Sequence, residues 1–241
     1  MNVLSIAQNV ADEVGVPRPS ILVSATDPIH QKIYRHINKV GTSLMRAHPW
    51  QELRKVQSIT AVAQALQTSA VPSNFDRFIP ETFWDLTGKT LINGPISPTE
   101  WASLSANSYA DTAVKKFTVR AGDIYIIPTP TAGDSYSFHY VSKNWVLDQD
   151  TTTEKSSVST DGDTLYLDDQ LVISGVVYEF LRGEGQPFQM AAATFDQMFR
   201  TLAGNEETGV SVLTMGDFFG SGRHYSGIPG GGSTYSIYSG W

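Results

Sequence analysis

Two kinds of hydrophobic periodicity follow one another along this chain, and their order limits what it can fold into. Both ends carry apolar residues at the three-and-four spacing of amphipathic helices, whereas the middle carries residues that alternate with a period of two. The economical arrangement packs the N- and C-terminal helix pairs as one antiparallel bundle, with a small β-sheet or barrel inserted between them. The predicted fold class is therefore α+β.

The N-terminal helix pair is delimited by clear cap residues. Residues 2–14 are predicted to form an amphipathic helix that ends at Gly15. A second helix is predicted to begin at Thr26 or Asp27 and to end before Pro49. Its apolar positions keep helical spacing throughout: Ile29, Ile33, Ile37, Val40 and Leu44.

The middle of the chain is predicted to form antiparallel strands. Residues 55–65 alternate and are rich in β-branched side chains. Strands around Phe117–Val119 and Ile124–Ile126 flank a short glycine-containing turn, which predicts a hairpin. A third strand is expected at 136–146, and all these strands are predicted to share one sheet, barrel or sandwich.

The polar stretch 148–164 is rich in Thr, Ser and Asp, so an exposed excursion is expected there. Two helices then return. The first is predicted to be capped by Asp168 or Asp169, and the second to start at Pro187 and to close at Gly204. The predicted organisation is a helical bundle of 1–54 with 165–206, an inserted β-rich lobe at 55–164, and an extended C-terminal arm at 207–241.

The arm combines Gly and Ser with interspersed aromatic residues. Its composition predicts flexibility in the free chain, and its aromatic side chains could anchor it on a partner. The candidate partner-binding residues are Phe218, Phe219, Tyr225, Tyr235, Tyr238 and Trp241.

Composition excludes several functions. The net charge of −7 disfavours a protein that grips nucleic acid by its phosphates. Cysteine is absent, so disulfides and thiolate chemistry are impossible. The N-terminus lacks the features of a signal peptide, and no window approaches the roughly 18 apolar residues of a membrane helix. Folding in a reducing cytosol is expected.

The stretch 71–104 concentrates tryptophans and turn residues, which indicates a folded corner. Carboxylates lie beside Trp84 and Trp101 there. A glycosidase would use paired carboxylates, whereas a sugar-binding module would use exposed tryptophans for stacking. The favoured interpretation is that both tryptophans fill a core and that Glu100 stands in the first turn of a helix begun by Ser97. The predicted structural residues are Trp84, Asp85, Gly94, Pro95 and Trp101.

Other candidate sites are weak. The five histidines are scattered without ligand spacing, and Asp161-Gly162-Asp163 is interpreted as a turn because it lacks the spacing of a calcium loop. The glycine-rich runs near 220 and 230 do not lie between a strand and a helix, as a phosphate loop requires. No catalytic residue, metal or cofactor is therefore predicted.

The central stretch resembles that of head-to-tail adaptor (connector) proteins of tailed bacteriophages, including the tail tubular protein A type. The residues that carry the resemblance are Pro72, Phe75, Arg77, Trp84-Asp85, Gly88, Gly94-Pro95 and Glu100-Trp101. The flanks agree, with a His48-Pro49-Trp50 step after the second helix. The resemblance covers 1–206 by order of elements and 72–104 by motif.

This resemblance implies a non-enzymatic virion protein at the head–tail junction, assembled in the cytoplasm of the host bacterium. Such subunits form a ring, commonly of twelve, beneath the portal protein. The ring joins the portal to a tail nozzle or tail-tube protein and continues the channel through which double-stranded DNA passes. The arm is then predicted to dock on the portal.

Two other functions fit the sequence less well. A baseplate or tail-fibre module would use exposed aromatics to bind a host glycan, but would have no need of four bundle-forming helices. A hydrolase would need a carboxylate pair or a triad, and no such constellation is recognisable.

Overall fold

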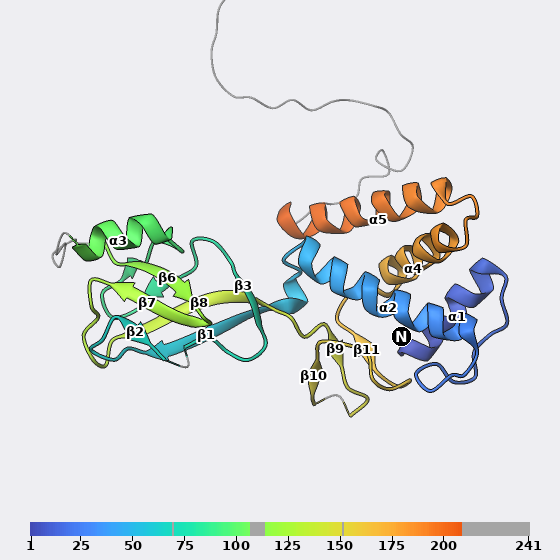
Figure 1. Cartoon of the computed structure of the whole chain (residues 1–241), viewed down its shortest axis with the longest axis horizontal. Coiled ribbons are helices and arrows are strands. Elements are labelled where there is room, and N and C mark those ends of the chain that lie inside the picture. Colours follow the sequence, from blue (N-terminus) through green and yellow to red (C-terminus); the bar gives the residue numbers. More distant parts are fainter. Residues whose placement is uncertain (69, 107–113, 151, 209–241) are drawn as a thin grey trace, which may run out of the picture.

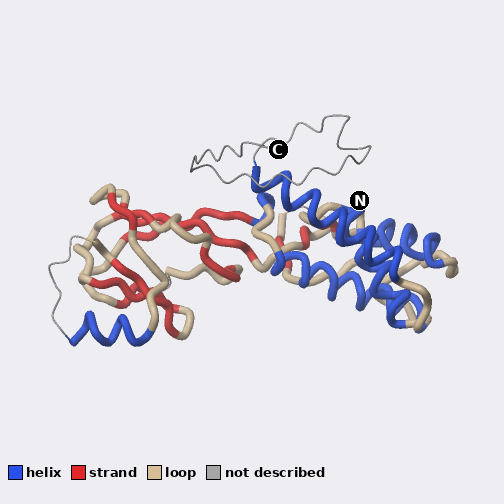
Figure 2. The backbone as a smooth tube through the Cα atoms, turned by 90° about the horizontal axis from the view of Figure 1, so that it is seen from above, coloured by secondary structure: helices blue, strands red, loops and turns tan. Residues whose placement is uncertain are grey.

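The computed structural model describes residues 1–68, 70–106, 114–150 and 152–208. Over these residues the chain forms five α-helices and small antiparallel sheets, which confirms the α+β class. The molecule is elongated. Most of the strands occupy one half and four of the helices the other, with a narrow waist between them (Figures 1 and 2).

Four helices make up most of the helical region, and α4 contacts each of the other three. Their bounds are α1 (Val3–Val14), α2 (Pro28–Ala47), α4 (Asp169–Gly183) and α5 (Gln189–Thr208). That they form a regular antiparallel bundle stays a prediction. The predicted arm lies outside the described residues from 209 onward, as do its six candidate binding residues.

The structure has cap residues at the predicted ends of the helices. Gly15 closes α1 in the left-handed conformation with a φ of 72°. The Asp27 carboxylate accepts the backbone N–H of Ile29, and Pro28 follows at the first helical position. Asp168 accepts the N–H of Leu171 at the start of α4.

The helical core is mostly aliphatic and closes around one tryptophan. Trp145 is fully buried although it lies outside the helices, between β8 (Ser135–Ser142) and β9 (Val146–Leu147). It packs directly on α2, where a Cβ at Gly41 would stand only 2.2 Å from the indole ring. Beside it a small sheet of β9 (Val146–Leu147), β10 (Glu154–Lys155) and β11 (Thr164–Leu165) covers the helices.

The expectation of an exposed polar excursion at 148–164 is wrong for its centre. Val158 is 2% exposed within the helical core cluster, and Asp163 is 0% exposed. Asp161 accepts the backbone N–H groups of Leu22 and Val23. The segment needs no core of its own, because its carboxylates satisfy backbone amides and its one valine enters the core of the helices.

Two antiparallel sheets build the β region around a shared aromatic core. The first contains β1 (Arg54–Thr60), β8 (Ser135–Ser142), β4 (Trp84–Asp85) and β5 (Thr90–Leu91), and β3 (Phe75–Phe78) also pairs with β8. The second contains β2 (Leu66–Gln67), β7 (Asp123–Ile127) and β6 (Lys116–Arg120). The helix α3 (Pro98–Ala106) lies over the second sheet (Figure 1).

The aromatic core lies between the two sheets. Tyr136, Phe138 and Tyr140 share one face of β8 and are buried, as their alternation predicts. Phe117 of β6 meets Phe83 edge to face, with the ring centroids 4.8 Å apart.

Several predicted boundaries need correction. The β6–β7 hairpin pairs with β2, not with β8, so the strands form two sheets where one was expected. The strand predicted at 55–65 ends at Thr60, and the one at 136–146 breaks after Ser142. Helix α5 continues through Gly204 to Thr208, because glycine costs only about 1 kcal/mol within a helix that has tertiary contacts.

The waist is joined by polar contacts. The Glu206 carboxylate of α5 accepts the backbone N–H of Gln51 at 2.9 Å and lies 3.9 Å from the Arg54 guanidinium, where β1 begins. Lys55 of β1 forms an ion pair with Glu154 of β10. The end of α5 is therefore held to the start of the β region.

Candidate interaction surfaces

A buried charged cluster organises the corner between β4 and β8. The Lys115 ammonium donates to the carboxylate of Asp85 at 2.7 Å, to the hydroxyl of Tyr136 at 2.8 Å and to Asp134 at 3.2 Å. Asp85 is buried and also accepts the backbone N–H of Gly88 at 2.7 Å. Asp85 was predicted as a structural residue, but nothing in the sequence pointed to Lys115 as its partner.

The titration of this cluster follows from its contacts. Burial tends to raise the pKa of Asp85, but the Gly88 amide and the Lys115 ammonium outweigh that effect and lower it. The pKa of Lys115 is raised despite its desolvation, since it donates to Asp85, Tyr136 and Asp134. Burial raises the pKa of Tyr136. Asp85 and Lys115 are therefore both charged and paired with each other at neutral pH, which suits a structural role.

Gly94 and Pro95 shape the close approach of the chain to β6. Gly94 has a φ of 153°, and a Cβ there would stand 2.4 Å from the carbonyl oxygen of Phe117. The Gly94–Pro95 peptide bond is cis. Asn93 and Ile96 on either side bond to the backbone of Lys115 and Phe117, so this turn closes the second sheet.

Trp101 fills a core position, as predicted. It is 9% exposed, and it lies on α3. Its ring lies under the Arg120 guanidinium, 4.9 Å from the ring centroid, and meets Tyr125 edge to face. The Ser97 hydroxyl accepts the N–H of Glu100, which confirms the predicted helix start.

The prediction that Trp84 fills a core is wrong. Trp84 is 45% exposed, and its neighbour Phe83 is the residue that enters the aromatic core. The register places Trp84 beside Ser137, and Ser137 beside Ser58 of β1. Strand alternation alone cannot decide which of two adjacent aromatics faces inward, because that depends on the partner strands.

The outer face of this sheet is uncharged around Trp84, whereas Arg54 and Arg77 stand on the same face near the waist, opposite Val141. The uncharged residues across β1, β8 and the β4 segment are Val56, Ser58, Thr60, Ser135, Ser137, His139, Thr82, Trp84 and Leu86. Val56 and Leu86 are exposed together with Trp84. An aromatic ring on a flat face of small polar residues can stack on a ligand or pack on a partner.

A second charged cluster secures the polar segment beneath the helices. Asp163 accepts the Lys155 ammonium at 2.8 Å and the backbone N–H groups of Ser159 and Thr160. Burial opposes ionisation, but these bonds lower the pKa of Asp163 to about 2. The structure confirms the turn predicted at 161–163.

The remaining acids and histidines form no recognisable catalytic or metal centre in the part of the chain that is described. Within 1–68, 70–106, 114–150 and 152–208, no three His, Cys, Asp or Glu side chains converge as metal ligands would. Glu100, one of the carboxylates beside the tryptophans, binds Lys116 at 2.7 Å. None of the described helices is both long and apolar enough to cross a bilayer.

Comparison with known proteins identifies the family of this chain. The sequence model of the SU10 adaptor protein family matches residues 1–215. The chain belongs to this family. No curated protein matches the chain significantly.

Membership in the SU10 adaptor family confirms the resemblance to bacteriophage head-to-tail adaptors, and indicates a structural protein of the virion. The narrower resemblance to the tail tubular protein A type stays a prediction. The match spans both the helical and the β region and ends at Met215, before all six aromatic residues of the predicted arm.

Proposed function

We propose that this adaptor forms a ring, of about twelve subunits as in the resembling connectors, beneath the portal at the capsid vertex. The ring joins the portal to a tail nozzle or tail-tube protein and continues the DNA channel for retention and ejection of the genome. The protein acts without catalytic turnover, at the head–tail junction of a virion assembled in the bacterial cytoplasm. The family match over residues 1–215 carries this proposal.

The shape and the charge of the subunit support it. An elongated molecule with two regions can act as a wedge, and wedges close into rings through heterologous contacts (Figure 1). The net charge of −7 suits a conduit, because a strongly basic lumen would hold DNA by its phosphates.

The test combines purified chain with portal rings from the same virus and sizes the products by native mass spectrometry. The expected product is a portal ring with a closed ring of adaptor subunits. The measurement is made with and without portal, because a subunit that is monomeric alone is still compatible with assembly on a template. Absence of any complex with portal at micromolar concentrations contradicts the proposal.

The C-terminal arm is proposed to dock on the portal. Its aromatic residues are Phe218, Phe219, Tyr225, Tyr235, Tyr238 and Trp241. Rigid aromatic anchors in a Gly- and Ser-rich segment supply contact area once a partner surface orders them.

Deletion of 216–241 tests the arm by itself. The truncated chain is expected to keep the unfolding midpoint of the full chain and to lose affinity for portal. A matched variant that keeps the arm's length but changes the six aromatic residues to Ser separates anchoring from tethering. Unchanged portal affinity in both variants would remove the arm from the interface.

A second candidate function has one observation in its favour. Trp84 is 45% exposed on the uncharged part of the outer sheet face, where an aromatic ring could stack on a sugar of a host glycan. A baseplate or tail-fibre module would behave in this way. Glycan-array binding that Trp84→Ala abolishes would support it, and an array without signal would dismiss it.

A further inference from the structure

Four basic residues follow one another along the exposed side of α2. Lys32, Arg35, Lys39 and Arg46 are spaced three, four and seven residues apart, so they form one row along the helix. They are exposed, and the core positions Ile33, Ile37 and Leu44 face away from them. Such a row is conspicuous in a chain that carries a net charge of −7.

Only part of this row is neutralised within the subunit. Lys32 binds Glu184 at 2.5 Å and Lys39 binds Glu179 at 2.7 Å, both on α4. Arg35 and Arg46 have no ion-pair or hydrogen-bond partner among the described residues. Two guanidinium groups are therefore available to an external acidic surface.

An acidic pocket with an apolar floor lies on another face of the helical region. Its volume is about 410 Å³. The apolar lining comes from Trp50, Leu165, Leu167 and Leu202, and the carboxylates come from Glu52, Asp168, Asp169 and Glu206. Met1 also lines the pocket, so the fold brings its lining together from four separate segments of the chain.

The carboxylates of the pocket are not equally free. Asp168 caps α4, and Asp169 binds the N-terminal amine of Met1. Glu206 accepts the backbone N–H of Gln51. Glu52 is exposed and forms no hydrogen bond or ion pair with the described residues. An arginine suits such a pocket, because its aliphatic stem packs on apolar side chains while its guanidinium binds carboxylates in a planar fork.

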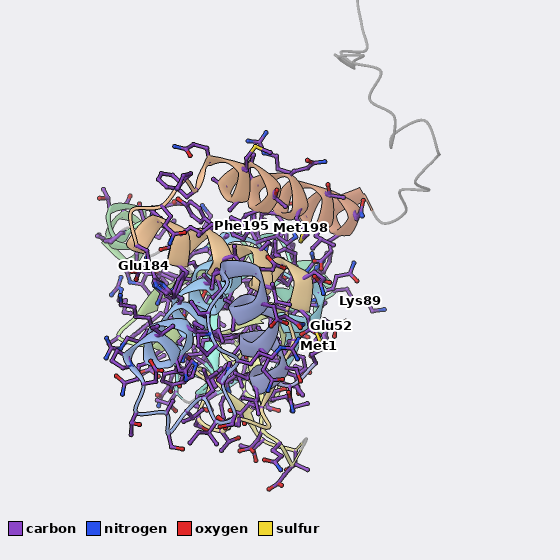
Figure 3. All side chains as sticks on the ribbon, turned by 90° about the vertical axis from the view of Figure 1, so that its right-hand side faces the viewer. Met1, Glu52, Lys89, Glu184, Phe195 and Met198 are labelled. Atoms are coloured by element: carbon purple, nitrogen blue, oxygen red, sulfur yellow. The ribbon has the colours of Figure 1, made fainter. Side chains whose placement is uncertain are left out.

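The Lys32 end of the basic row and the pocket lie on different sides of the helical region. Figure 3 looks along the long axis and shows Glu184, the partner of Lys32, at one side and Met1 and Glu52 at the other. A surface on one side that complements a surface on the other is what a heterologous, head-to-tail contact requires, and such contacts generate rings when the rotation closes.

We propose that the basic row of α2 in one copy docks in the acidic pocket around Glu52 of the next copy, called the Glu52 pocket below. The occupant of the pocket is Arg35 or Arg46 of a second copy of this chain, and opposite charge sets the register of the subunits. This inference rests on the proposed ring and specifies the contact that would build it.

Charge swapping tests the contact. Arg35→Glu, Arg46→Glu and Glu52→Arg are each expected to lower the fraction of subunits in portal-bound rings about tenfold, at a concentration where the unmodified chain is half assembled. Combining Glu52→Arg with Arg46→Glu, or with Arg35→Glu, restores opposite charges at every interface of a homogeneous ring. One of these two double variants is expected to recover assembly.

The controls separate assembly from folding. Lys89→Glu reverses an exposed charge in the turn between β4 and β5, outside both surfaces, and should assemble normally. Every variant should keep the thermal unfolding midpoint of the unmodified chain, since the altered residues are exposed. Assembly of the unmodified chain should weaken as salt rises.

The outcomes separate this inference from the function beneath it. If the unmodified chain forms no ring on portal, the proposed function fails and the contact fails with it. If rings form but single reversals leave them intact, or neither double variant recovers assembly, the contact alone is overturned. Loss of binding to a short double-stranded DNA on Arg46→Glu, without recovery in the swap, would instead assign the row to nucleic acid.

Discussion

The helical and β regions are stabilised by different kinds of contact. The helical region closes an aliphatic core around Trp145, and long capped helices supply its hydrogen bonds. The β region has strands of two to eight residues, so it depends on interlocked aromatic rings, a special glycine and the Lys115 cluster. We therefore expect substitutions that remove buried side-chain volume to destabilise the helical region most. Substitutions that remove a buried polar partner or alter a turn should destabilise the β region most.

The largest effect is expected at Trp145. Trp145→Ala removes a fully buried indole, and it should cost about 3–5 kcal/mol of unfolding free energy in urea melts. Trp145→Phe should cost less because it keeps most of the ring. Ile21→Ala, at a half-exposed residue, is the control for apolar truncation. A loss below about 1 kcal/mol for Trp145→Ala would contradict a core closed around this residue.

Two adjacent lysines test the polar dependence of the β region. Lys115→Met leaves the buried Asp85 carboxylate without its cation, and should cost about 3 kcal/mol. Lys116→Met breaks only the partly exposed pair with Glu100, and should cost less than about 1 kcal/mol. Equal losses of unfolding free energy for Lys115→Met and Lys116→Met in chemical denaturation would show that the Lys115 cluster contributes no more to stability than the partly exposed pair.

Two glycines with positive φ separate steric contact from backbone strain. Gly94→Ala introduces a Cβ 2.4 Å from a carbonyl oxygen, and should cost about 2–3 kcal/mol. Gly122→Ala has a φ of 87° but open space around the new Cβ, so its cost should stay near 1 kcal/mol. Thermal melts of both variants measure the difference, and a reversed order would refute the close approach.

Acid titration probes the polar segment under the helices. The pKa of Asp163 is lowered to about 2 from an ordinary value of 3.8, so its contribution is complete above pH 4 and is lost as pH falls toward 2. The loss should amount to about 2 kcal/mol, and Asp163→Asn should remove this part of the pH dependence. Identical acid profiles for the two proteins would show that Asp163 is not held by these bonds.

The smallest effect is expected at Trp84. Trp84→Ala should cost less than about 1 kcal/mol, because the side chain is nearly half exposed. Trp101→Ala is the matched comparison and should cost about 3 kcal/mol. A large loss at Trp84 in the denaturant melts would return this residue to the core.

Local features of the chain were predictable, whereas contacts between distant residues were not. Asp27 with Pro28, and Gly15, mark helix ends because cap bonds form within a few residues. The Lys115–Asp85 pair joins residues that are 30 positions apart, and no spacing rule predicts it. Trp84 and Phe83 alternate equally well, so only the pairing of β4 with β8 decides which one is buried.

The interaction surfaces show the same division. Family membership could be predicted from the turn and aromatic residues of 72–104. The basic row of α2 is visible as a spacing in the sequence, but its significance depends on Glu179 and Glu184 from α4, which neutralise two of its four members. The Glu52 pocket draws on four segments, so its formation requires the tertiary fold.

The bond between Glu206 and Gln51 has a mechanical consequence. Because the last turns of α5 are fastened where β1 begins, a load applied beyond Thr208 enters the molecule at the waist and does not have to travel along the helices. Tension at that end of the chain would therefore bear first on the contact between Glu206 and Gln51.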